Sequence, residues 1–275
     1  MPLSDEILLK RLSRQEWTAQ NIRLSDQVTT WPGHADFNTD LRLHAIRRIL
    51  SALYPGGLNG LRVADLGCLE GGFSLELAKQ GMIATGVEAR EKNIEKCRLL
   101  ADHFELPQLS FVKDDVKNFS AENYGTFDVV LALGILYHLD NPVAWLDQIA
   151  ETTRKVLIIE SHYAPADDAA MALIEPQLQR LSPLKQIEHK DARYQGRWFF
   201  EYEPQLADRE NQLWASYSNG SSFWLTKESL LLATQRAGFD LVLEQHDYSA
   251  EHYEFHTYRR SRGMFVAIKR GGLPG

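Results

Sequence analysis

The sequence predicts an α/β protein with a mostly parallel sheet. The first observation is a strand–turn–helix–strand pattern at residues 62–90, in which two short apolar runs, 63–66 and 83–87, flank a glycine-rich turn and a helical stretch. The second is a run of five apolar residues at 129–133, which is typical of a strand buried on both faces. Strands that alternate with helical patterns form βαβ units, and these units build parallel sheets.

The remaining elements follow from apolar periodicity and from Pro and Gly breakers. Residues 4–30 predict one or two helices, residues 28–38 a loop, and residues 39–54 a further helix. Strands are expected at 109–112, 154–160, 241–244 and 263–268, and helices at 91–103, 143–149, 169–181 and 227–237, the last with Thr226 as N-cap. A strand or hairpin is expected at 193–202.

Composition restricts the class of protein. The 275 residues are 44% hydrophobic and 24% charged, as in a globular protein, and no apolar run is long enough to span a membrane. The N-terminus mixes both charges and does not read as a signal peptide. Two cysteines, Cys68 and Cys97, read as buried apolar residues, and no metal-ligand spacing is present. We therefore expect a cytoplasmic protein without a metal.

The net charge of −7 disfavours a nucleic-acid partner, because such proteins present a basic face. Basic residues do cluster at 42–48 and 259–262, but both clusters are short and typical of a solvated surface.

The turn after the first strand separates two classes of nucleotide site. A dinucleotide site has the spacing G-x-G-x-x-G, with a pyrophosphate at the helix N-terminus. Here Leu69 and Glu70 interrupt that spacing, and an acid at this point suits a ligand that carries an ammonium or a sulfonium. A nicotinamide dehydrogenase is therefore disfavoured. Glu88, which ends the second strand about 20 residues past the turn, can accept hydrogen bonds from ribose hydroxyls.

The stretch DLGCLEGG (65–72) resembles motif I of the class I S-adenosylmethionine (SAM)-dependent methyltransferases, D/E-x-G-x-G-x-G, with Leu69 in place of the middle glycine. The resemblance implies SAM as cofactor and S-adenosylhomocysteine (SAH) as product. It also implies a Rossmann-like, seven-stranded, mostly parallel sheet with helices on both faces. The cofactor-binding residues that it implies are Asp65, Gly67, Cys68, Leu69, Glu70, Gly71, Phe73, Glu88, Ala89, Asp115, Val116, Leu133 and Gly134.

Two further stretches carry the resemblance. LYHLDNP (136–142) is similar to the motif IV region of the family, and FWLTKESLLLATQRAGF (223–239) is similar to its closing elements. Parallel strands place their carboxyl ends at one edge of the sheet, and Glu88, Asp115 and Glu160 all follow such ends. The branch of tRNA wobble-uridine carboxymethyltransferases shares some of these elements and remains the second candidate.

The chain divides into four predicted segments: an N-terminal helical extension or lid at 1–60, a SAM-binding core at 61–160, an insertion after the fifth strand at 161–222, and the rest of the core at 223–270. The insertion is rich in aromatic residues and too long for an ordinary connection. It suits an acceptor pocket, and the alternative is a homodimer interface or a structural cap. Candidate substrate-binding residues are Trp17, Asn21, Tyr137, Tyr194, Arg197 and Trp198.

Methyl transfer is an in-line displacement that holds the nucleophile about 3 Å from the methyl carbon. A hydroxyl or a protonated amine needs a base, and histidine is the usual one. His138, after the fourth strand, and His162, after the fifth, are the catalytic candidates, ahead of His252 and His256. We expect methylation of a small-molecule oxygen or nitrogen. The alternatives are a tRNA-modifying transferase and a SAM-binding protein without transfer activity.

Overall fold

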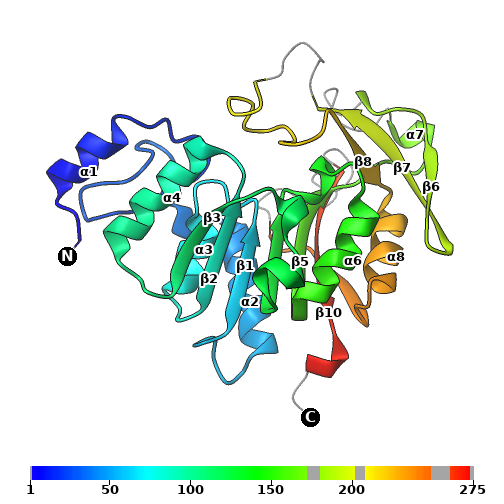
Figure 1. Ribbon diagram of the computed structural model, residues 1–275, viewed down its shortest axis with the longest axis horizontal. Helices are drawn as coiled ribbons and strands as arrows, with labels where there is room; N and C mark the ends of the chain where they lie inside the picture. The colour runs from blue at the N-terminus through cyan, green and yellow to red at the C-terminus, as the bar shows by residue number, and fades with distance from the viewer. Residues whose placement is uncertain (1, 172–179, 202–207, 249–260, 273–275) are drawn as a thin grey trace. The chain divides into compact units, whose positions relative to one another are not determined.

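The computed structural model describes residues 2–171, 180–201, 208–248 and 261–272. The chain forms two compact units, Met1–Val116 and Lys117–Gly275 (Figure 1). The larger of its two sheets has seven strands in the order β3-β2-β1-β4-β5-β10-β9, and the smaller has the order β6-β7-β8. The first unit ends within the segment predicted as the cofactor core.

The first unit is a parallel sheet with helices packed on it. Strand β1 pairs with β2, and β2 pairs with β3, both in parallel. Helix α4 lies against β3 and β2 (Figure 1). The elements in chain order are α1 Asp5–Leu12, η1 Phe37–Thr39, α2 Leu41–Leu53, β1 Arg62–Leu66, α3 Gly72–Ala78, β2 Ile83–Glu88, α4 Glu91–Phe104 and β3 Leu109–Lys113.

The predicted helical structure at 4–30 is correct only for α1. This helix begins where the side chain of Ser4 accepts a hydrogen bond from the backbone of Ile7. Beyond Leu12 the chain is irregular, because side chains bind its backbone in place of helical partners. The hydroxyl of Thr30 accepts from the Ile22 N–H and donates to the Gln20 carbonyl, both at 2.8 Å.

The second unit contains the rest of the larger sheet. Strands β4 and β5 are parallel, and β10 is antiparallel to both β5 and β9, as expected for a closing pair. The elements in chain order are η2 Val116–Asn118 at the boundary, α5 Ala121–Tyr124, β4 Phe127–Leu133, η3 Leu136–His138, α6 Pro142–Thr152, β5 Thr153–His162, α7 Asp168–Met171, β6 Lys185–His189, β7 Ala192–Phe200, β8 Ser221–Leu225, α8 Lys227–Arg236, β9 Leu241–Gln245, β10 Arg262–Ile268 and η6 Arg270–Gly272.

Local signals set the ends of two helices in this unit. Helix α6 begins with Pro142 after Asn141, whose side chain accepts from the backbone of Ala144. Helix α8 begins after Thr226, whose hydroxyl accepts from Ser229, so the predicted N-cap is confirmed. Of the helix predicted at 169–181, α7 covers only the first residues, and most of the remainder lies outside the described residues.

The small antiparallel sheet comes mainly from the insertion. Strand β7 pairs with β6 on one side and with β8 on the other, and α8 packs against β7 and β8 (Figure 1). The strand predicted at 193–202 is therefore confirmed as β7. Strand β8 was not expected, because a five-residue strand directly before a helix leaves no periodic pattern of its own.

The described residues include no helix with the length and apolar character needed to cross a membrane.

Replacing Gly196 of β7 by alanine should destabilise the protein. The added Cβ would lie 2.4 Å from the carbonyl oxygen of Trp224 and 2.5 Å from the ring of Phe223. The strand pairing holds that backbone in place, so we expect a loss of about 2 kcal/mol in the free energy of unfolding, measured by urea denaturation. Gly220→Ala is the control, because nothing lies within 4 Å of its Cβ position. Equal stability of the two variants would contradict this packing.

Candidate functional site

The loop between β1 and α3 has three residues with left-handed backbone. Gly67 has φ +69°, Leu69 +56° and Gly71 +86°. The N–H groups of Gly67 and Cys68 both donate to the Val87 carbonyl, at 2.8 and 3.0 Å, so the loop folds back on the end of β2. Leucine in this conformation costs about 1 kcal/mol, which the glycine usual at this position would avoid. The substitution therefore changes the side chain but preserves the bend.

Glu88 connects this loop to the end of β2. The residue is 3% exposed. One oxygen accepts the Leu69 N–H at 3.1 Å and the other accepts the Arg90 N–H at 2.9 Å. Burial raises the pKa of this carboxyl, and the two hydrogen bonds act in the opposite direction. Each oxygen has a second lone pair, so the group fits a ligand that offers hydroxyl donors, as the ribose of SAM does.

Asp65 holds the base of the loop. The carboxylate at the end of β1 accepts a hydrogen bond of 2.7 Å from the hydroxyl of Ser74 in α3. Burial raises the pKa of Asp65 to about 6, against the Ser74 hydrogen bonds that lower it. Its bond to Ser74 joins β1 to α3, so the side chain of Asp65 supports the structure of the loop.

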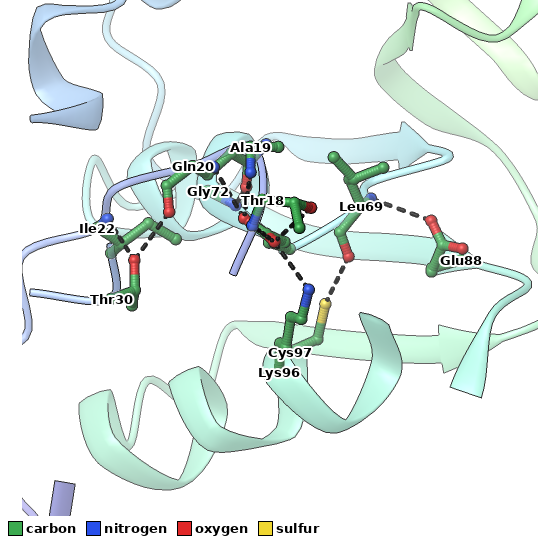
Figure 2. A network of polar contacts seen from close by, with 11 residues as sticks. Thr18, Ala19, Gln20, Ile22, Thr30, Leu69, Gly72, Glu88, Lys96 and Cys97 are labelled. Atoms are coloured by element: carbon green, nitrogen blue, oxygen red, sulfur yellow. Dashed lines mark hydrogen bonds and ion pairs between the residues drawn. The ribbon is translucent and has the colours of Figure 1, made fainter. Parts of the chain in front are cut away.

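Glu70 has a different role from the one expected. Its carboxylate is fully buried and accepts the backbone N–H groups of Thr18, Ala19 and Gln20 at 2.8, 3.2 and 2.8 Å. The ammonium of Lys96 lies 2.8 Å from it. Figure 2 shows these donors converging from the N-terminal segment and from α4. The charge that was expected to face a cationic ligand is therefore neutralised within the protein.

The N-terminal segment also contacts the start of α3. The side-chain oxygen of Gln20 accepts the Gly72 N–H at 2.7 Å. A Cβ on Gly72 would lie 2.8 Å from that oxygen and from the ring of Phe37. Phe37 in turn packs edge-on against Phe73 at 4.9 Å, which places the predicted cofactor residue Phe73 in the core.

Two N-terminal substrate candidates differ in their surroundings. Trp17 is 5% exposed and lies under the Lys96 ammonium at 5.6 Å, and its indole N–H has no acceptor among the described residues. Asn21 donates to the His34 carbonyl and accepts the Trp31 N–H, at 2.7 and 2.9 Å. Asn21 therefore shapes its own loop, which argues against the substrate role predicted for it.

The two cysteines lie in or beside the loop between β1 and α3. Both are free and buried, and the Cys97 thiol donates to the Leu69 carbonyl at 3.4 Å (Figure 2). Burial raises the pKa of the Cys68 thiol well above its usual value. Both thiols therefore act as apolar packing groups, as the sequence indicated.

The other predicted cofactor residues of this unit follow β2 and β3. Ala89, directly after Glu88, is half-buried, and Val116 is buried. The side chain of Asp114 accepts the Asp115 N–H at 2.8 Å.

In the second unit, the turn after β4 is held by β5. Leu133 is opposite Glu160 in the strand register, and the Gly134 N–H donates to the Glu160 carbonyl at 2.8 Å. Gly134 has φ +76°, and a Cβ there would lie 3.5 Å from the guanidinium of Arg262. The turn therefore brings backbone close to a charged pair.

That charged pair is Glu160 with Arg262, and no local pattern in the sequence indicates it. Arg262 donates from Nε and Nη2 to the two carboxylate oxygens of Glu160, with the second bond at 2.7 Å. Its Nη1 lies 3.4 Å from Nε2 of His162. This contact occupies the ring nitrogen that would otherwise accept a proton, which weakens His162 as a candidate base. Only the antiparallel register of β10 with β5 reveals this contact.

Aromatic rings surround His162. Its ring stacks on Trp224 at 4.9 Å and meets the edge of Tyr137 at 4.7 Å. Burial raises the pKa of the Tyr137 phenol, so this group remains protonated near neutral pH and can act as a hydrogen-bond donor.

His138 has a carboxylate partner. Its Nδ1 lies 3.0 and 3.1 Å from the two oxygens of Glu201, whose side chain is 1% exposed. The His138 side chain is 13% exposed. Glu201 was not among the predicted residues, since it lies 63 positions away with no motif around it.

The insertion candidates are in or beside the small sheet. Arg197 is 1% exposed and donates to the carbonyls of Pro165 and Ser182 at 2.9 and 3.1 Å. Its donors thus hold the insertion together, contrary to the predicted substrate clamp. Tyr194 is buried, and Trp198 packs edge-on against Phe223 at 5.1 Å. His252 and His256 lie outside the described residues.

Within the described ranges, no cluster of His, Cys, Asp and Glu side chains is arranged to hold a metal ion.

The family model described as a methyltransferase domain matches residues 37–244, which is more than half of the chain. The chain belongs to this methyltransferase family. The prediction made from motif I is therefore confirmed at the level of the family.

Curated relatives match the chain over part of their length. A ubiquinone biosynthesis O-methyltransferase of Vibrio campbellii is 32% identical over 114 residues, which cover 42% of this chain and 48% of that protein. The O-antigen chain terminator bifunctional methyltransferase/kinase WbdD of Escherichia coli is 29% identical over 135 residues, or 46% of this chain and 19% of that protein. The match thus spans about half of the first relative and a fifth of the second.

Solved structures share the fold. The N-terminal domain of EvdMO1, crystallised with SAH and D-fucose, has a TM-score of 0.72 at 22% identity, with 98% of both chains covered. Magnesium protoporphyrin IX methyltransferase from Synechocystis with bound SAM has a TM-score of 0.52 at 16% identity, over 87% of this chain and 86% of that one. The predicted class I methyltransferase fold is confirmed, and SAM is the cofactor of this class.

Replacing Lys96 by methionine should destabilise the protein, because the buried Glu70 charge would lose its cation. Removing one partner of a buried ion pair costs about 3 kcal/mol, which urea denaturation measures directly. Lys92→Met on the exposed side of α4 is the control and should change stability by less than about 0.5 kcal/mol. A loss below about 1 kcal/mol for the Lys96 variant would contradict the role of this pair.

Asp65 should make stability depend on pH. Its pKa in the folded chain, about 6, lies above its ordinary value of 3.8. The folded state therefore loses stability as pH rises between these two values, by about 3 kcal/mol in total. Asp65→Asn removes this titration, so its stability relative to the natural protein should increase from pH 4 to pH 7. Denaturation curves at several pH values test this, and a constant difference would refute it.

Proposed function

We propose that this protein transfers the methyl group of SAM to an oxygen or nitrogen atom of a small-molecule acceptor. The observation that carries the proposal is the position of Glu88. Its buried carboxylate ends β2, binds the N–H of Leu69 in the motif I loop, and has lone pairs left for hydroxyl donors. SAM supplies the electrophilic methyl group, and the protein's own groups bind and orient the reactants.

The cofactor loop would hold the ribose through Glu88 and approach the rest of the ligand with its backbone, where Gly67 and Gly71 have no side chains. Asp115 and Val116, after β3, are the proposed contacts of the adenine ring, and Trp17 is a proposed part of the cover. The side chains of Glu70 and Asp65 support the loop from behind and are not assigned a contact with the ligand.

Leu133, Gly134, Tyr137 and His138, which follow β4, are proposed to face the reacting groups. The Tyr137 phenol, with its raised pKa, is suited to donate a hydrogen bond to the acceptor. His138 is the better base of the two histidine candidates, because Arg262 occupies the nitrogen of His162 that would otherwise accept a proton.

A small-molecule acceptor is supported by two lines. The relatives named above include an O-methyltransferase of ubiquinone biosynthesis. The chain has a net charge of −7, which is unfavourable for binding tRNA. Salt-sensitive binding of tRNA would favour a tRNA-modifying transferase instead. Binding of SAM with no turnover of any acceptor would favour a non-catalytic SAM-binding protein.

Calorimetric titration with SAM, SAH and NAD in parallel is the direct test. We expect micromolar binding of SAM and SAH, or about −8 kcal/mol, and no heat from NAD. Failure of both SAM and SAH to bind would overturn the proposal.

Glu88→Gln should weaken SAH binding by about 10- to 100-fold, because a charged acceptor of the ribose hydroxyls is lost. Glu91→Gln on the first turn of α4 is the control, since its exposed carboxylate pairs with the side chains of Lys113 and Arg98. Titration of both variants measures the difference, and denaturation curves show whether each remains folded. Unchanged affinity in Glu88→Gln would remove this residue from the site.

A further inference from the structure

The pair formed by His138 and Glu201 has the geometry of a base and its orienting acid. A carboxylate that accepts from Nδ1 stabilises the tautomer with the proton on Nδ1 and the lone pair on Nε2. Nε2 of His138 has no hydrogen bond to any residue in the described ranges. The ring nitrogen that could take a proton is therefore the one that the protein does not use for its own structure.

Glu201 is itself held from two sides. The Ser222 hydroxyl in β8 donates to one carboxylate oxygen, and the Ser216 N–H donates to the other at 3.1 Å. Its orientation toward His138 is thus set by two donors, neither of which carries a charge. None of these partners is a guanidinium or an ammonium group.

The backbone of His138 is fixed by the same loop. Asn219 donates from its side-chain nitrogen to the His138 carbonyl at 3.0 Å, and its oxygen accepts from the Ser216 hydroxyl at 2.8 Å. One short segment, 216–222, therefore holds both the ring partner and the main chain of this histidine. Such support on two sides keeps a catalytic group in one orientation.

Two titratable side chains contact the His138 ring in the described residues, Glu201 through hydrogen bonds and Tyr137 through ring packing. Tyr137 is the neighbour in η3, with ring centroids 4.2 Å apart, and it lies on the side toward Arg262, whose guanidinium is 5.5 Å from the Tyr137 ring. The phenol is un-ionised near neutral pH because burial raises its pKa. The carboxylate that hydrogen-bonds the imidazole is therefore that of Glu201.

We propose that Glu201 is a positioning residue that makes His138 the general base for an acceptor with an un-ionised hydroxyl. The inference rests on the proposed methyl transfer and specifies its acceptor class. Nε2 takes the hydroxyl proton while the acceptor oxygen bonds to the methyl carbon and the carbon–sulfur bond breaks. The products are the methyl ether, SAH and a protonated His138, whose charge Glu201 compensates. A carboxylate or neutral amine acceptor would not require this pair.

The first test needs no acceptor. Nitrogen-15 NMR of histidine-labelled protein at pH 8, with the His138 signals assigned from a His138→Gln variant, reports the tautomer. We expect the proton on Nδ1 of His138 in the natural protein. A proton on Nε2 instead would overturn the proposal.

The second test uses SAM with three probe classes: a catechol, a hexose and a primary aliphatic amine. SAH formation is followed by mass spectrometry. We expect turnover of a hydroxyl probe, and Glu201→Gln should lower kcat about 100-fold with the SAH dissociation constant unchanged. Glu201→Asp should recover part of the loss. Glu188→Gln, in exposed strand β6, is the control and should match the natural protein.

A double variant distinguishes positioning from general stability. If Glu201 acts through His138, Glu201→Gln should cause no further loss of kcat in a His138→Gln background. If the two residues act independently, the two losses of kcat should multiply. Multiplied losses, or turnover of the amine alone, would overturn the inference and leave the SAM-dependent function intact. Absence of SAH binding would instead overturn the proposed function itself.

Discussion

The buried charge of Glu70 is the constraint on which the first unit depends. A carboxylate removed from water is stable only when its oxygens are fully compensated, and here the compensation comes from three consecutive N–H groups of the N-terminal segment and from Lys96 of α4. If either partner moved away, it would leave an uncompensated charge. The N-terminal segment, the motif I loop and α4 are therefore held together, and this rigidity offsets the unfavourable backbone of Leu69.

The second unit contains two buried carboxylates, Glu160 and Glu201, whose hydrogen-bond partners differ in charge. Glu160 is paired with a guanidinium through two hydrogen bonds, so its charge is already balanced. Glu201 is bound by a hydroxyl, a backbone N–H and an imidazole nitrogen. The second arrangement has no guanidinium or ammonium partner among the residues that the structure describes, so Glu201 is the acid that we propose to stabilise a newly formed cation. The difference in partners thus favours a structural role for Glu160 and the proposed chemical role for Glu201.

The features that the sequence predicted well depend on neighbouring residues. The strand–turn–helix unit and the N-cap Thr226 are encoded by apolar runs, glycines and a capping hydroxyl within a few positions. The roles of Glu70 and Arg197 were misjudged because their partners lie far away in the chain, and residue type alone suggested a ligand. Arg262 and Glu201 had no local signal, since each acquires its partner only through strand register or loop closure.

The groups that hold His138 in place come from separate parts of the chain. The histidine follows a strand of the larger sheet, whereas its carboxylate follows β7 and the serine that orients it belongs to β8. A relative that retained the methyltransferase core but had a shorter insertion would keep the histidine and lose the acid. Cofactor binding and acceptor chemistry can therefore diverge separately in such chains, and the length of the insertion becomes a marker of which relatives carry the positioning acid.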